Sequence, residues 1–267
     1  ARVKRDLAFG ALVRAALLTF VLAGMLLSAV LQLGRAGYVA VLLVWVAWLV
    51  LSFRSMRSQR MAAGSAPLIA AGEYELAEKQ IEGALRSFSV FRSSKLLGLH
   101  NLAVLRHAQR RWSEAVLLCR AVLAEKPLQN GALTRTARLV LADSLLELND
   151  LGGAYEAISG LYRERLSLGE ALRLVRSQLD YESRIGAWPA MCQGMERKVQ
   201  LSELMPSDQG ARTLALLALA ARKLGKESVA DYLRRRAELL VSPTTLIKER
   251  PLLAELWPAN QPADGGL

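Results

Sequence analysis

The sequence has few of the residues from which catalytic and metal sites are usually built. Its 267 residues contain only two cysteines and two histidines. Cys119 and Cys192 fall on apolar helix faces without the spacing of metal ligands, which predicts buried free thiols and suits a reducing compartment. His100 and His107 share a helix face, but no carboxylate or cysteine lies four residues from either, so we expect no metal site.

The sequence motifs of the common enzyme classes are also missing. No convincing strand is predicted, and no glycine-rich phosphate loop, nucleophile elbow or His-Glu-x-x-His motif is found. We therefore expect a protein that is not an enzyme and that needs no catalytic residues, metal or cofactor. A binding function remains.

Positive charge is concentrated at the start of the chain. The net charge is +11, but residues 1–60 hold eight basic residues and a single acidic one, Asp6. The remainder has 27 basic and 23 acidic residues, a net charge of only +4. The excess thus belongs to the flanks of an apolar segment, and we expect neither a nucleic acid nor a small-molecule substrate as a partner.

Two long apolar runs dominate this first segment. Residues 15–33 are uncharged and would span about 28 Å as a helix, close to the thickness of a bilayer core. A tight turn at 34–37 separates them from a second run at 38–53, about 24 Å long as a helix. A cleaved signal peptide is the alternative for the first run, but this run is long for one, and the second run follows at once. The pattern predicts a two-helix transmembrane hairpin.

Basic residues flank this hairpin on the side of its two ends. Because such residues favour the cytoplasmic side, we expect the N-terminus and everything after the hairpin to be cytoplasmic. The sequence thus predicts an integral membrane protein, expected in a bacterial inner membrane, with the lipid bilayer as one partner. The flanking residues are Arg2, Lys4, Arg5, Arg54, Arg57 and Arg60, whereas the turn has only Arg35.

The rest of the chain is organised around a repeated pattern, seen best from Leu99 to Pro127. It predicts two short amphipathic helices joined by a polar elbow at residues 109–111, with Ala115 where the helices cross. Similar elbows recur, and each is followed by an equivalent position separated from the next by 38, 39, 37 and 39 residues. Such units bury their apolar faces only against neighbours, so the period predicts a helical repeat array. The equivalent positions are Ala77, Ala115, Ala154, Met191 and Ala230.

This stretch resembles a tetratricopeptide repeat (TPR), on the pair Leu102-Ala103 followed by Trp112, Ala115 and the closing Pro127. The resemblance implies an all-α fold in which about five helix pairs form an α-solenoid over residues 61–242. We expect the hairpin domain to occupy residues 1–60, and a terminal cap with a disordered tail to occupy 243–267. The residues expected to form the cap are Leu252, Leu253, Leu256 and Trp257.

The resemblance also implies a function. In this repeat family the first helix of each unit lines a concave surface that takes peptides or helices. We therefore expect a membrane-tethered adaptor or scaffold that binds a protein or peptide partner there. The alternative is a structural or assembly subunit of a larger membrane protein complex, with the hairpin making the main contacts. The expected concave residues are His100, Asn101, Val104, His107, Asp143, Glu147, Arg173, Arg176, Asp180, Arg184, Arg212 and Arg222.

A hairpin followed by repeats is also similar to the organisation of HemY-type inner-membrane proteins, which are associated with tetrapyrrole synthesis. In sequence this similarity rests on Gly37-Tyr38-Val39.

Overall fold

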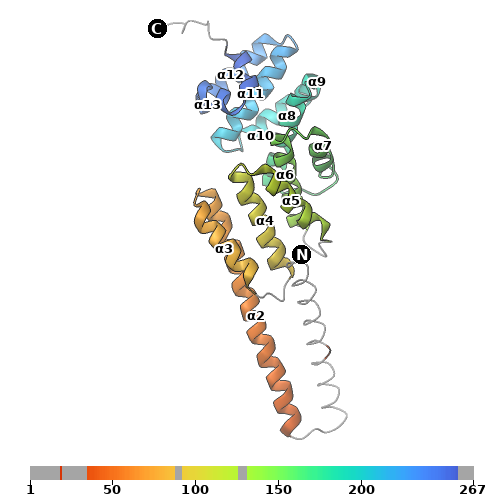
Figure 1. Ribbon diagram of the computed structural model, residues 1–267. Helices are drawn as coiled ribbons and strands as arrows, with labels where there is room; N and C mark the ends of the chain where they lie inside the picture. The colour runs from red at the N-terminus through yellow and green to blue at the C-terminus, as the bar shows by residue number, and fades with distance from the viewer. Residues whose placement is uncertain (1–18, 20–34, 88–91, 126–130, 258–267) are drawn as a thin grey trace. The chain divides into compact units, whose positions relative to one another are not determined.

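The protein is all-α, as predicted, and its computed structural model describes Thr19 and residues 35–87, 92–125 and 131–257 (Figure 1). No strand occurs among these residues. Figure 1 shows the long helix α2 and the shorter helices that follow it. They are α2 (Arg35–Ala70), α3 (Tyr74–Arg86), α4 (Arg92–Ala108), α5 (Trp112–Ala124), α6 (Gly131–Glu147), α7 (Leu151–Ser159), α8 (Leu168–Arg184), α9 (Trp188–Cys192), α10 (Met195–Ser202), α11 (Ser207–Lys223), α12 (Glu227–Leu240), α13 (Pro243–Glu249) and the 3-10 helix η1 (Pro251–Leu256).

The structure contradicts the predicted integral membrane localisation. In the described part of the chain, no helix is long and apolar enough to cross a membrane. The first predicted span, 15–33, lies outside the described residues apart from Thr19. The second, 38–53, lies within α2, which begins at Arg35 and continues to Ala70. Its apolar run of about 24 Å is shorter than the ~30 Å core of a bilayer. The transmembrane hairpin and the cytoplasmic orientation derived from it therefore have no support.

In each of five helix pairs, the two helices are joined by an elbow, and the five elbows have the same backbone geometry. Each elbow contains one residue in the left-handed region, with φ between 58° and 80°. At each, two N–H groups return to carbonyls of the preceding helix; Lys226, for example, donates to Ala221 at 2.9 Å. The residue five positions later is fully buried in every pair, as Ala115 is. The left-handed residues are Gly72, Arg110, Asn149, Gly186 and Gly225.

The described chain divides into two compact units, with the boundary between Ser144 and Leu145 near the end of α6. This division reflects packing, and the domain boundaries at 60 and 242 stay predictions from sequence composition. In unit 1, α2 packs against α3 and α4, and α4 packs against α5. The buried Ser58 hydroxyl donates to the Ala84 carbonyl at 3.0 Å, which ties α2 to the end of α3. The later part of α2 thus forms the first helix of the first pair.

Unit 2 is built around α11. This helix packs against α8, α9, α10, α12 and η1. Its residues from Ala211 to Ala221 are all buried except Arg212, which is partly exposed. Near its start, a Cβ at Gly210 would stand only 2.8 Å from the Ser202 carbonyl oxygen, so glycine is needed for this approach. Leu253 and Leu256 of η1 are fully buried against this core, whereas Leu252 is 38% exposed, and the terminal cap stays a prediction.

Candidate functional site

Three of the predicted concave residues are used inside unit 1. The Asn101 amide is buried and donates to the Ala62 carbonyl at 2.6 Å and to the Ser65 hydroxyl at 3.0 Å. Val104 packs against the apolar cluster of Ile69, Ala77, Ile81 and Leu105, and His100 is buried. Asn101 and Val104 thus hold α4 against α2 and offer little to a ligand.

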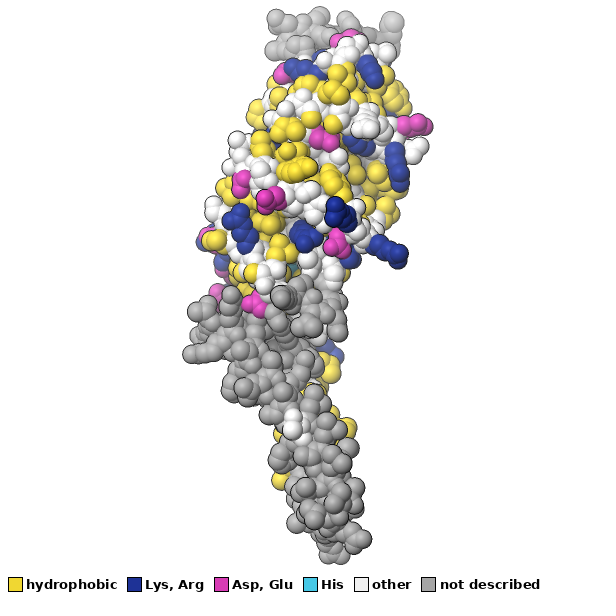
Figure 2. Space-filling model, turned by 90° about the vertical axis from the view of Figure 1, so that its right-hand side faces the viewer, with side chains coloured by type: hydrophobic (Ala, Val, Ile, Leu, Met, Phe, Trp, Pro, Cys, Tyr) yellow, Lys and Arg dark blue, Asp and Glu magenta, His cyan; other side chains and the backbone are white. Residues whose placement is uncertain are grey.

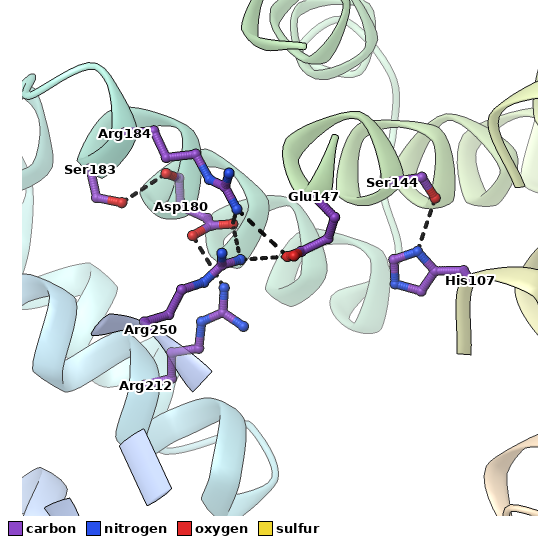
Figure 3. Close-up of polar contacts among 8 residues, drawn as sticks. All are labelled: His107, Ser144, Glu147, Asp180, Ser183, Arg184, Arg212 and Arg250. Carbon is purple, nitrogen blue, oxygen red and sulfur yellow. Dashed lines mark hydrogen bonds and ion pairs between the residues drawn. The ribbon is translucent and has the colours of Figure 1, made fainter. Parts of the chain in front are cut away.

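His107 and Asp143 also lie in unit 1. The Nδ1 atom of His107 is 2.9 Å from the Ser144 hydroxyl, and its ring is tilted against Trp112 at 4.9 Å between centroids. Figure 3 shows the ring directed at Ser144 on the next first helix. Asp143 is buried. His107 thus links α4 to α6.

In unit 2, three predicted residues come together around the buried carboxylate of a fourth, Asp180. Its placement begins with the capping box of α8. The Ser167 hydroxyl accepts from the Glu170 backbone N–H, and Glu170 accepts from the Ser167 N–H at 2.7 Å. Because this fixes the start of the helix, Asp180 and Arg184, four residues apart, emerge on one face near its end.

A group of five residues, named the arginine cluster, forms around Asp180: Glu147, Asp180, Arg184, Arg212 and Arg250 (Figure 3). Arg250 makes the closest pairs, with Nη2 2.5 Å from Asp180 Oδ2 and 2.6 Å from Glu147 Oε1. Arg212 Nη2 is 3.1 Å from Asp180 Oδ1. Arg184 Nη2 is farther from both carboxylates, at 3.5 Å from Asp180 and 3.6 Å from Glu147.

The arginine cluster is largely desolvated, but the side chains of its three arginines are not fully buried. The Asp180 side chain is 6% exposed, whereas the three arginine side chains are 16–20% exposed. Burial lowers the pKa of Arg212; the Asp180 carboxylate opposes this shift, and the charges of Arg250 and Arg176 add to it. Several positive charges thus lie close together around Arg212.

The other predicted basic residues are placed differently. Arg173 and Arg176 lie on α8 and are partly buried. Arg222 belongs to a different group of contacts, since it pairs with Glu227 and Asp231 of α12 at 3.5 Å and donates to the Glu255 carbonyl.

Sequence analysis missed Arg250, which directly follows α13. The periodic repeats end before this residue, so no repeat position could indicate it.

Exposed apolar side chains follow the elbow ends of the first helices in unit 2. Leu148, Ile185 and Leu224 are each the residue before the left-handed one, and they are 38–48% exposed. Leu148 and Ile185 directly follow Glu147 and Arg184 of the arginine cluster. A charged site with apolar neighbours is the composition expected of a surface that binds a protein segment.

The described residues include no group of three or more His, Cys, Asp or Glu that could hold a metal ion. Comparisons with protein-family models, with curated proteins and with solved structures find no match for this chain.

Proposed function

We propose that the protein is an adaptor whose TPR-like α-solenoid binds a segment of a protein partner along the inner faces of the first helices. The main support is the arginine cluster, because it joins residues from α6, α8 and α11. These are the first helices of successive pairs, which is the arrangement that the repeat family uses for a concave binding surface. Glu147, Asp180, Arg184 and Arg212 are the residues through which the partner would be recognised.

The surface composition also favours a protein partner over a nucleic acid. On the face shown in Figure 2, basic, acidic and hydrophobic side chains lie interspersed over the described surface. Nucleic-acid binding usually requires basic residues clustered on one face. A surface of mixed charge with apolar side chains suits a protein segment that presents both charged and apolar side chains.

Charge reversal on α8 tests the proposal, because Arg176 lies close enough to the arginine cluster for its charge to lower the pKa of Arg212. We expect Arg173→Glu combined with Arg176→Glu to abolish capture of the main partner in a crosslinking pull-down at matched expression. The matched control is Arg163→Glu with Arg165→Glu, two exposed residues before α8, which should leave capture intact. Equal recovery of every copurifying protein with both double variants would contradict the proposal.

A second candidate function is supported by α2: a structural or assembly subunit of a larger protein complex. Eight large apolar side chains of this helix are 48–72% exposed, and exposed apolar patches of this kind usually mark protein contacts. Salt separates the two candidates, because it screens an arginine-based contact and leaves an apolar one in place. A subunit should stay in fixed stoichiometry at high salt, whereas an adaptor should release its partner. The eight residues are Leu42, Leu43, Trp45, Val46, Leu49, Val50, Phe53 and Met56.

A further inference from the structure

The charges of the arginine cluster do not balance. Three guanidinium groups face two carboxylates, so the cluster carries one positive charge more than it neutralises. Because the site is mostly buried, water solvates this charge only in part, and Arg176 adds further positive charge near Arg212. An anion that reached the cluster would therefore be attracted to it.

The surplus belongs to Arg184. Its guanidinium makes the two longest ion pairs of the cluster, at 3.5 and 3.6 Å. Its Nε and Nη2 atoms are buried and have no acceptor at hydrogen-bonding distance. If Arg184 turned away, Arg212 and Arg250 would still balance Asp180 and Glu147, through pairs of 2.5–3.1 Å. Of the three arginines, Arg184 can therefore leave its partners at the lowest cost.

The position of Arg184 would let its side chain meet a ligand after such a turn. It is the last residue of α8, its side chain is 19% exposed, and the exposed Ile185 follows it directly. The Nε and Nη2 donors form the planar fork that pairs with both oxygens of a carboxylate. A ligand carboxylate at the exposed edge would thus satisfy two donors that the folded chain leaves without acceptors.

We propose that Arg184 turns out of the arginine cluster to bind a carboxylate of an acidic partner segment, while Arg212 and Arg250 keep Asp180 and Glu147 neutralised. This inference rests on the proposed adaptor function and names the class of partner: a protein segment whose aspartate or glutamate side chain enters between the first helices of unit 2. The remaining contacts of that segment lie on the apolar residues beside the elbows.

The test measures binding of fluorescent hexaglutamate to the full chain, with hexalysine and a thymidine oligonucleotide as comparison probes. Arg184→Gln should weaken hexaglutamate binding about tenfold, the effect of one bidentate charge-assisted pair. Arg184→Lys keeps the charge but lacks the planar fork, so its affinity for hexaglutamate should lie between those of the wild type and Arg184→Gln. The matched control is Arg236→Gln on α12, which removes an arginine paired with Glu203. This variant should bind hexaglutamate like the wild type.

Two further measurements separate binding from folding. Arg184→Gln should unfold at nearly the wild-type urea midpoint, because the remaining charges balance, whereas Arg250→Gln should unfold earlier. Glu147→Gln, at a side chain that is 32% exposed, should bind hexaglutamate more tightly, because it increases the surplus charge.

Wild-type binding by Arg184→Gln, or weaker binding by Glu147→Gln, would overturn the inference. Preference of the wild type for hexalysine, or oligonucleotide binding that depends on Arg184, would overturn the choice of an acidic protein segment. If Arg184→Gln binds hexaglutamate like the wild type but the Arg173→Glu, Arg176→Glu variant still loses its partner, the adaptor function stands and this inference fails.

Discussion

The left-handed elbow residues allow a sharp test of the repeated backbone geometry. Gly225 has φ of 72°, and a Cβ added there would meet no heavy atom within 4 Å. Gly225→Ala therefore introduces backbone strain without a steric clash. For alanine, strain in this region destabilises the folded state by about 1–2 kcal/mol. Alanine also lowers the conformational entropy of the unfolded chain, which stabilises the folded state by about 0.4–1 kcal/mol. We expect unit 2 to lose about 1 kcal/mol of stability from these two opposing effects.

Gly169→Ala is the matched control for this change. Gly169 lies in the first turn of α8 without a positive φ, and a Cβ there would also meet nothing within 4 Å. The same substitution should therefore stabilise the protein by about 0.5–1 kcal/mol. Urea denaturation of the two variants measures the contrast. Midpoint shifts in the same direction would refute the elbow geometry described for Gly225.

The remaining predictions concern packing and pH. Ala115→Leu should cost about 1–3 kcal/mol because it overfills a fully buried helix crossing, whereas Ala121→Leu at an exposed position of the same helix should cost less than about 0.5 kcal/mol; thermal unfolding compares them. Leu253→Ala should cost about 2–4 kcal/mol because it opens a cavity under the terminal cap, and the same change at the exposed preceding leucine should cost far less. Arg106 donates a 2.5 Å hydrogen bond to Glu78 and lowers the pKa of this carboxyl below its ordinary value of 4.5. The resulting stabilisation is present above that ordinary value and is lost as the pH falls through the lowered pKa, so Glu78→Gln should reduce the acid-side loss in a pH series of urea midpoints.

The helix pairs could be predicted because their signals are local. A left-handed residue favours glycine, and three elbows have one; a close crossing favours alanine, and four of the five crossing positions have one. Both signals depend on the shape of a single residue, so they can be recognised in a single sequence. The elbow at Arg110, which lacks glycine, was found from the polar residues 109–111 between two amphipathic stretches, and the elbow at Asn149 from the period.

The second helix of the fourth pair could not be predicted in the same way. The chain breaks after α9, at Gly194 with φ of 62°, and resumes as α10. The Lys198 ammonium satisfies the freed end of α9 by donating to the Ala190 and Met191 carbonyls at 3.1 and 3.0 Å. This arrangement involves a lysine several residues beyond the break, which no periodic pattern encodes.

The second apolar run misled the prediction for a different reason. Residues 38–53 have the composition of a membrane span, but their helix continues into the first repeat pair, where Ser58 and Ala62 are fully buried. Composition reports which solvent a segment prefers and carries little information on where its helix ends. Arg250 was missed for a related reason, because long-range charge pairing leaves no periodic trace.

The equal lengths of four of the first helices constrain how the chain can change. Helices α4, α6, α8 and α11 each have 17 residues. One residue inserted within such a helix turns everything after it by about 100°. An insertion early in α8 would thus carry Asp180 and Arg184 away from Arg250, while the buried face rotated into solvent. Between pairs, as at Glu203–Pro206, extra residues shift no such register. Insertions and deletions should therefore be tolerated between the helix pairs and rejected within their first helices, and length variation becomes a readable sign of which segments carry the site.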